Sequence, residues 1–390
     1  MISMKICAVI SEFNPFHLGH KYIIENIRKN GVTHVVAIMS GNFVQRGEPA
    51  IISKAARTKM ALQNGVDLVI EIPTVWSVST AEKYAFAGVS IANALGCVDV
   101  LGFGSECGNI DALNEIQNIF ETQNFSDALK KHLSYGLTFA KAREIAVKEC
   151  LGDSFAKILQ SPNNTLGIEY IKALKQLGCC DIEPFTIKRA ENYKSASFIR
   201  KLIDNKDYSF EKYVPKNSYV IMEQINNSKA PATLGYAQRA IISKLRTMDI
   251  EDISKLPDIS EGLENRIYKA IQTSISLREL MDKIKTKRYT MARIKRIILS
   301  AYLGITSEMQ NSTIPYIRIL GTNSKGLEIL KKAKSTSMLP IVSRYSDVSK
   351  LSDEAKFVFQ KECLFMDLYN AITPQISPCG EEQKFKMIKV

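Results

Sequence analysis

His17 and His20, three positions apart, are the residues that most clearly indicate chemistry in this sequence. They follow an apolar run, residues 5–10, that indicates a buried strand, and they lead into residues 21–27, whose apolar spacing is helical. The first amides of a helix lack intrahelical partners, and the helix dipole places partial positive charge there, so phosphate is a natural ligand. Both imidazoles lie on one side of the turn, and Gly19 lets a nucleotide approach the backbone. The stretch predicts a phosphate-binding turn; the alternative is a histidine pair that only caps and packs it.

Two further stretches supply cations beside predicted helix starts. Residues 195–200 open a helix with hydroxyls and place Arg200 on the next turn, which predicts a second anion site by the same amide and dipole argument. Ser53 is a predicted helix cap, and Lys54 and Arg57 follow it on one face, where they could bind the β- and γ-phosphates of a nucleotide. The alternatives are a capped helix with an exposed arginine and a solvated basic face.

Alternating strands and helices are expected to position these groups. Their lengths imply right-handed crossovers and a parallel sheet covered on both faces, which is a Rossmann-like α/β fold. Ligands of such sheets bind at the carboxyl ends of the strands, where Gly104 falls, unless it is only a turn glycine. Asn164 begins a later helix, either as its cap or with its amide turned toward an adenine or ribose edge. The predicted strands are residues 5–10, 33–39, 66–73, 98–106 and 182–187, and a helix is predicted at 80–95.

A change along the chain, from alternating strand and helix patterns to mostly helical ones, predicts two domains. Residues 1–204 form the α/β domain, with a helical insertion at about 111–160, and residues 205–390 form a mostly helical, basic domain. One more strand, at 314–321, and a helix at 353–370 are expected in the second domain.

A basic stretch in the second domain is the candidate nucleic-acid contact. From Arg278 to Arg296 eight Lys or Arg stand against Glu279 and Asp282, with Tyr289 between them. Such a stripe can follow a phosphate backbone while the tyrosine stacks on a base. The alternative is a solvated charged helix, since no RNA-binding motif accompanies it. The candidate contacts are Lys283, Lys285, Lys287, Arg288, Arg293, Lys295 and Arg296.

Composition limits the class of protein. The chain has 390 residues, 45% of them hydrophobic and 24% charged, which is typical of a soluble globular protein, and no run suggests a membrane span or a secretory signal. The net charge of +12 favours an acidic partner such as nucleic acid. Eight cysteines lack zinc-ligand spacing, so we expect free thiols in a reducing cytoplasm and no protein-held metal. Neither a P-loop nor a complete dinucleotide fingerprint occurs, which argues against P-loop enzymes and dehydrogenases.

Five motifs together resemble the bacterial tRNA(Met) cytidine acetate ligase family, within the HxGH nucleotidylyltransferase superfamily. The resemblance covers the first two hundred residues; in the second half it rests on length and basic character. Leu18 and Phe198 depart from the usual pattern, where a polar and a small residue are more common. The motifs are residues 12–20 (EFNPFHLGH), 40–50 (SGNFVQRGEPA), 67–73 (DLVIEIP), 161–164 (SPNN) and 195–200 (SASFIR).

The resemblance implies a nucleotidyltransferase-like catalytic domain that performs two-stage chemistry. ATP, accompanied by Mg²⁺ held mainly by phosphates and water, reacts with acetate to give acetyl-adenylate, and the acetyl group passes to the wobble cytidine of elongator tRNA(Met). It assigns His17 and His20 to the phosphates, and Lys54, Arg57 and Arg200 to a pyrophosphate clamp. The basic stretch would bind tRNA, and the oligomeric state stays open. The implied ATP site is Ile10, Ser11, Glu12, Phe13, Asn14, Pro15, Phe16, His17, Gly19, His20, Lys21, Tyr22, Gly104, Asn164, Arg189 and Ser197.

Two other functions remain open from the sequence. A small-molecule adenylyltransferase of the pantetheine-phosphate or nicotinamide-mononucleotide type would transfer AMP to a phosphate and ignore tRNA, but the long basic second half argues against it. A non-catalytic RNA-binding protein on the same scaffold would bind tRNA without ATP turnover, and the intact His17, His20 and Arg200 argue against that.

Overall fold

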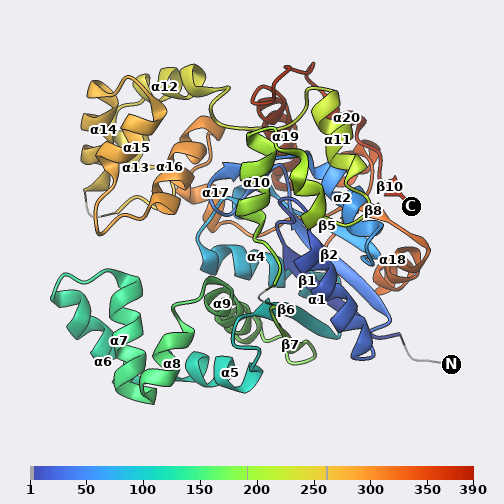
Figure 1. The fold of residues 1–390 in the computed structure, drawn as a ribbon, viewed down its shortest axis with the longest axis horizontal. Coiled ribbons are helices and arrows are strands. Elements are labelled where there is room, and N and C mark those ends of the chain that lie inside the picture. The colour runs from blue at the N-terminus through green and yellow to red at the C-terminus, as the bar shows by residue number, and fades with distance from the viewer. Residues whose placement is uncertain (1–3, 191, 261) are drawn as a thin grey trace.

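A mixed, largely parallel sheet forms the centre of the molecule (Figure 1). The structure is a computed structural model that describes residues 4–190, 192–260 and 262–390. The strand order is β10-β8-β5-β2-β1-β6-β7, β9 pairs with β8, and β3 and β4 form a separate hairpin. The strands are β1 (Ile6–Ser11), β2 (His34–Ser40), β3 (Phe43–Val44), β4 (Glu48–Pro49), β5 (Leu68–Ile72), β6 (Val100–Ser105), β7 (Glu183–Lys188), β8 (Ile317–Thr322), β9 (Ile341–Val342) and β10 (Ile388–Lys389).

Chain order reverses at β1, which pairs in parallel with β2 on one side and β6 on the other. In open α/β sheets the crevice at such a reversal is where ligands bind, outside the carboxyl ends of the strands. The loop that carries His17 and His20 leaves β1 at this point. The predicted α/β fold and the placement of the first motif within it are therefore confirmed.

The sheet is buried on both faces because its strands present apolar side chains alternately to two cores. In β1, Ile6, Ala8 and Ile10 face one core, while Cys7 and Val9 face the other. This explains why the strands read as continuous apolar runs. The first core is covered by α4 (Ala81–Ala94), α9 (Pro162–Gln176) and α18 (Ser324–Thr336), and the second by α1 (Leu18–Lys29), α2 (Lys54–Leu62), α10 (Ala196–Asp204) and α11 (Tyr219–Asn226).

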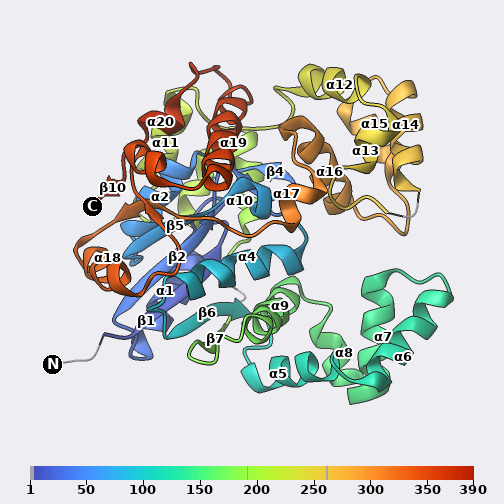
Figure 2. The same cartoon turned by 180° about the vertical axis from the view of Figure 1, so that it is seen from behind.

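Two groups of helices project from the sheet domain (Figures 1 and 2). The insertion begins directly after the carboxyl end of β6, and a separate helical lobe lies between α11 and β8. The insertion is α5 (Ile110–Ile119), α6 (Gln123–Ser134), α7 (Phe139–Leu151) and α8 (Asp153–Ile158); the lobe is α12 (Gln238–Arg246), α13 (Ile250–Ser254), α14 (Leu263–Thr273), α15 (Leu277–Ile284) and α16 (Met291–Leu303). The remaining short elements are α3 (Thr74–Ser77), α17 (Ser307–Asn311), α20 (Glu381–Lys384), η1 (Tyr208–Tyr213) and η2 (Tyr345–Lys350).

The predicted domain boundary at residue 204 needs correction, because the chain returns to the sheet after the lobe. β8 pairs antiparallel with β5, and β10 pairs with β8. The last segment includes α19 (Asp353–Asn370), at the predicted position, and its side chains belong to the first core. A parallel or antiparallel pairing between strands so distant in sequence leaves no local signal, so the pattern of residues 314–321 showed a strand but not its partner.

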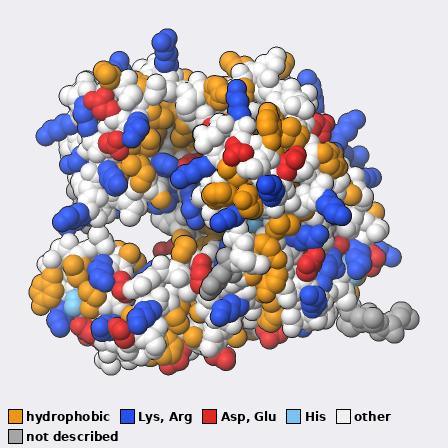
Figure 3. All heavy atoms as spheres, viewed as in Figure 1, with side chains coloured by type: hydrophobic (Ala, Val, Ile, Leu, Met, Phe, Trp, Pro, Cys, Tyr) orange, Lys and Arg blue, Asp and Glu red, His pale blue; other side chains and the backbone are white. Residues whose placement is uncertain are grey.

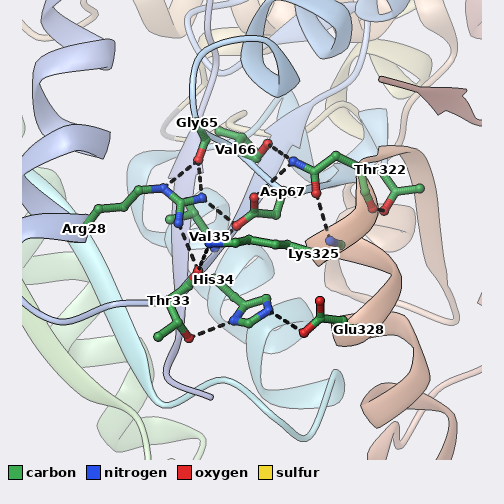
Figure 4. Close-up of polar contacts among 12 residues, drawn as sticks. Arg28, Thr33, His34, Val35, Gly65, Val66, Asp67, Thr322, Lys325 and Glu328 are labelled. Carbon is green, nitrogen blue, oxygen red and sulfur yellow. Dashed lines mark hydrogen bonds and ion pairs between the residues drawn. The ribbon is translucent and has the colours of Figure 1, made fainter. Parts of the chain in front are cut away.

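Polar contacts fasten this returning segment to the amino ends of β2 and β5 (Figure 4). The Asp67 carboxylate accepts hydrogen bonds from the Val35 backbone amide at 2.8 Å and from the Asn323 side-chain amide at 3.0 Å, and it pairs with Arg28 at 2.6 Å. His34 lies 3.3 Å from Glu328 of α18. The sheet domain is thus built from both ends of the chain.

A cluster of buried charges lies deeper between the same segments. Lys54 Nζ is 2.8 Å from Glu71 and 2.7 Å from Glu382, and Glu382 also pairs with Arg318 at 3.1 Å. Glu362 of α19 accepts from the backbone amide and hydroxyl of Thr74, at 2.6 and 2.8 Å. Buried ion pairs of this kind stabilise a fold only while every partner is present.

Glu362 makes the stability of this cluster depend on pH. Burial, and then the Glu71 carboxylate, raise the pKa of Glu362 to about 8. Between the ordinary value of about 4.3 and 8 the folded chain holds a proton that the unfolded chain has lost, so this group's contribution to stability falls as pH rises, by up to about 1.4 kcal/mol per pH unit. Glu362→Gln keeps an acceptor and a donor for Thr74. We expect the variant to gain stability relative to the wild type from pH 5 to 8 in urea unfolding; a difference that does not change with pH would contradict this.

Within the described ranges, none of the helices combines the length and apolar character needed to cross a bilayer.

Candidate active site

The two histidines cap the helix that follows β1, and the caps fix their tautomers. His17 Nδ1 accepts the backbone amide of Gly19 at 3.0 Å, and His20 Nδ1 accepts the backbone amide of His17 at 3.2 Å. Because each Nδ1 is an acceptor, each neutral ring carries its proton on Nε2. The rings stack with centroids 3.8 Å apart. The cap and the ligand-binding interpretation are therefore compatible, since capping leaves one N–H donor on each ring for a ligand.

Burial and nearby positive charge favour the neutral form of both imidazoles. Burial, and then the charges of Arg189 and Arg200, lower the pKa of His17 to about 3. Burial, and then His17 and Arg189, hold the pKa of His20 well below its usual value. The pair therefore presents N–H dipoles rather than full charges, and the nearby arginines supply the positive charge.

This neutrality can be measured directly. In spectra of protein labelled at histidine, we expect the ring signal of His17 to stay constant between pH 5 and 8, because its pKa of about 3 lies below that window, and we expect no titration of His20 near its ordinary pKa, because burial holds its pKa well below that value. A His17→Asn variant assigns the signals. A titration midpoint between pH 6 and 7 for either ring would refute the described burial.

The loop between β1 and α1 is held by its neighbours in a conformation of its own. Phe13 has a φ of 44°, which is rare for a residue with a side chain and persists where surrounding contacts impose it. Asn14 is 2% exposed and its Oδ1 accepts the Ile51 amide at 2.8 Å. Phe13 and Phe16 are buried against the His20 ring, with centroids 5.0 and 5.5 Å from it. These predicted site residues shape the loop.

Arg200 reaches this loop from α10. Its Nη1 donates to the Asn14 carbonyl at 2.9 Å and its Nη2 donates to Ser197 Oγ at 3.0 Å. Ser195 caps α10 as predicted, by accepting the Phe198 amide. Arg189 follows β7, and its charge acts on both histidines. The structure thus brings together the histidine pair, Arg189, Ser197 and Arg200 from three separate segments.

Lys54 and Arg57 do not form the exposed clamp that we predicted, although Ser53 caps their helix as expected. Lys54 is 2% exposed and belongs to the buried charge cluster. Arg57 is fully buried and donates to the backbone carbonyls of Ile52, Glu12, Ser40 and Gly41. The basic face of this helix packs inward because buried carboxylates pair with Lys54 and backbone carbonyls accept hydrogen bonds from Arg57. Both residues therefore support the site from below and are not exposed at its surface.

Gly104 and Asn164, both predicted to contact the nucleotide, also have close protein contacts. A side chain at Gly104 would collide with Ile23 of α1 and crowd Arg189. Asn164 Oδ1 accepts the amides of Glu106 and Cys107 at 2.8 and 3.0 Å, and its Nδ2 donates to the Ile158 carbonyl. Asn164 is therefore not the cap of its helix, which is Ser161, and its side chain fixes the loop after β6; its contact with a nucleotide stays a prediction.

The remaining predicted nucleotide contacts lie around the helix start. Ile10 is buried in the sheet, Lys21 points along α1 to Glu25 at 3.8 Å, and the Tyr22 ring lies 5.7 Å from that of Tyr193. Ser11 Oγ accepts the Phe13 amide at 3.3 Å.

The hairpin β3–β4, within the motif at residues 40–50, also contacts the site, and its contacts could not be predicted from the sequence. Glu12 Oε1 accepts the Gln45 amide at 3.0 Å. Burial raises the pKa of the Glu12 carboxyl, against the opposing charges of Arg46 and Arg200. Glu48 lies between two basic groups, paired with Arg200 at 3.9 Å and with Lys295 of α16. The hairpin thus connects the residues around the β1–α1 loop to the helical lobe.

Comparison with known proteins decides the family. The sequence pattern of the HIGH Nucleotidyl Transferase family matches residues 4–384. A tRNA(Met) cytidine acetate ligase of Thermoanaerobacter sp. (strain X514) is 39% identical, over 99% of this chain and 100% of the relative, and one of Acetivibrio thermocellus is 40% identical over 94% of each. The crystal structure of Thermotoga maritima TmcAL bound with alpha-thio ATP superposes with a TM-score of 0.94 at 31% identity, over 99% of this chain and 100% of that one. This chain belongs to the tRNA(Met) cytidine acetate ligase family.

Membership in the ligase family confirms the resemblance seen in the first two hundred residues and extends it to both halves of the chain. The helical lobe and the returning strands are therefore family features. The sequence motifs did not reveal the lobe and the returning strands as family features, because the similarity in that half of the chain is spread over many residues and forms no short motif.

The basic stretch of the lobe is not one continuous element. It divides into α15 and α16, joined by residues 285–290, and Tyr289 is only 7% exposed, so it cannot stack on a base as it stands. Several of its cations meet protein partners: Lys283 pairs with Glu279, Arg293 donates to the Asp258 carbonyl, Arg296 pairs with Asp258, and Lys295 pairs with Glu48. The exposed cations of the stretch include Lys285, Lys287 and Arg288.

Proposed function

We propose that this protein is an ATP-dependent ligase that activates acetate as acetyl-adenylate and acetylates the wobble cytidine of elongator tRNA(Met). The observation that carries the proposal is the convergence of two Nε2–H donors and two arginines at the amino end of α1, in a chain whose relatives of matching length are named for this reaction.

In the first stage an acetate oxygen attacks the α-phosphorus of ATP, a phosphorus–oxygen bond forms, and the bond to the leaving pyrophosphate breaks. Acetate is a weak nucleophile, so the enzyme must hold it in line and stabilise the charge that develops on phosphate oxygens. The Nε2–H groups of His17 and His20 would donate to those oxygens, and Arg189 and Arg200 would neutralise the departing pyrophosphate. These donors are fixed by the loop contacts before any ligand arrives, which is the preorganisation that such catalysis needs.

Asn14 supplies a further donor for this stage. Its Nδ2 is buried and has no hydrogen-bond partner within the described residues. A buried donor without a partner costs about 1–3 kcal/mol, and a phosphate or acetate oxygen would satisfy it.

In the second stage the cytidine amine attacks the acyl carbon, the acyl–phosphate bond breaks, and AMP leaves. The amine is accessible only when the base leaves its stack, and an anticodon loop meets that requirement because its bases are unpaired. Mg²⁺ would arrive with ATP: in the described part of the chain no group of three or more potential ligands is placed to hold a metal ion.

The first stage can be tested by following labelled pyrophosphate into ATP, with and without acetate and with and without unmodified elongator tRNA(Met). We expect exchange that requires acetate. Exchange that ignores acetate, or transfer of AMP to pantetheine phosphate or nicotinamide mononucleotide in its place, would contradict the proposal.

A further inference from the structure

The loop joining α6 and α7 exposes aromatic side chains at the end of the insertion. Tyr135 is 68% exposed and Phe139 is 58% exposed, and Leu133 beside them is 38% exposed. Large apolar side chains are mostly buried in a folded domain. Three exposed ones within the seven residues 133–139 therefore form an unusual apolar patch. Tyr289 of the lobe is buried and presents no exposed aromatic ring, whereas the insertion presents two.

The same loop is basic. Between Ala128 and Arg143 the sequence has no Asp or Glu; Lys130 and Lys131 are exposed, and the exposed Lys141 pairs with Glu144 at 3.1 Å. Arg143 lies over the Phe139 ring at 5.7 Å. Exposed aromatic rings among lysines are the combination by which proteins bind unpaired nucleic acid, because bases stack on the rings while the cations meet phosphates.

The position of the loop fits such a ligand. The insertion starts at the carboxyl end of β6, and the lobe contacts the hairpin that follows β2, so both project from the edge of the sheet that carries the histidine pair. In Figure 1 the α6–α7 loop points toward the α12–α16 lobe, and Figure 3 shows a hollow between the two, with Lys and Arg side chains around it.

We propose that the α6–α7 loop is an RNA-binding surface, on which Tyr135 and Phe139 stack on unpaired bases of the tRNA whose cytidine is acetylated. This inference rests on the proposed function and deepens it. The RNA would be held from both sides of the hollow: the basic lobe would contact the phosphates of the RNA, and the insertion would contact its bases. When the cytidine leaves its stack, the neighbouring bases lose a stacking partner. The exposed rings of Tyr135 and Phe139 would replace that partner and hold the neighbouring bases in place.

The test compares full-length variants. The double variant Tyr135→Ala/Phe139→Ala should weaken binding of unmodified elongator tRNA(Met) about 30-fold or more, since the loss of each stacking ring alone should weaken it about 5-fold or more. It should leave acetate-dependent pyrophosphate exchange measured without RNA at the wild-type rate, because the loop is absent from the adenylate site. The conservative exchange Tyr135→Phe/Phe139→Tyr should restore tRNA binding.

A matched control is available on another part of the surface. Tyr345 is 51% exposed, and Phe357 is 46% exposed under Lys361 as Phe139 is under Arg143. The variant Tyr345→Ala/Phe357→Ala should bind tRNA like the wild type. Three results would overturn the inference: unchanged tRNA binding by the Tyr135/Phe139 variant, equal weakening in the control, or a change of oligomeric state that marks the loop as a self-association surface. Failure of the wild type to exchange pyrophosphate would instead count against the proposed function, while the binding comparison would still decide the role of the loop.

Discussion

Replacing His20 with alanine is expected to lower the rate of acetyl-adenylate formation about 100- to 1000-fold, the usual effect of removing one fixed donor from a developing oxyanion. In the proposed reaction His20 Nε2–H is the donor, and the ring is held by Phe13, Phe16 and His17. Single-turnover formation of the adenylate, followed by quenching, measures the effect. A loss below tenfold in a folded variant would mean that the histidine pair does not contact the reacting phosphate.

His17 allows the capping role and the catalytic role to be separated. Asparagine can accept the Gly19 amide as His17 Nδ1 does, but it has no group at the position of Nε2. We expect His17→Asn to keep most of the free energy of unfolding and lose the rate, whereas His17→Ala should lose the rate and about 0.5–2 kcal/mol as well. If His17→Asn keeps the rate, the histidine is there only for the cap.

The largest expected effect on stability follows replacement of Lys54. Lys54→Met leaves the carboxylates of Glu71 and Glu382 buried without their shared cation, so we expect a loss of about 3–5 kcal/mol in the free energy of unfolding. The double variant Lys54→Met/Glu382→Gln should recover part of it. Denaturation in urea gives both values.

Lys59 is the matched control on the same helix. Its side chain is 38% exposed and 3.9 Å from Glu223, so Lys59→Met should change stability by less than about 1 kcal/mol. If instead Lys54→Met folded with wild-type stability and only weakened ATP binding, the original interpretation of Lys54 as a phosphate clamp would be restored and the buried cluster refuted.

These cases show what the sequence could and could not predict. The longer strands, the helix starts at Leu18 and Ala196 and the convergence of the histidines with Arg200 were predictable, because they depend on local patterns and on the rule that ligands bind at strand ends. The two-residue strands β3, β4, β9 and β10 were not predicted. The burial of Lys54 and Arg57 was not, because a basic helical face looks solvated until its partners are known. Glu382 and Arg318, which surround Lys54, come from the far end of the chain.

The same limit applies to the RNA-binding elements. Charge count alone pointed to residues 278–296, where the structure pairs several cations internally and buries Tyr289. The rings of Tyr135 and Phe139 carry no sequence signature, since exposed and buried aromatic residues look alike in a helical hairpin until it is folded.

The most direct test of the account incubates the protein with labelled acetate, ATP and unmodified elongator tRNA(Met), then digests the RNA and separates its nucleosides. The account predicts label in N4-acetylcytidine that requires ATP and is lost in His20→Ala. Tight tRNA binding without labelled acetylcytidine, or acetylation that survives in His20→Ala, would contradict it.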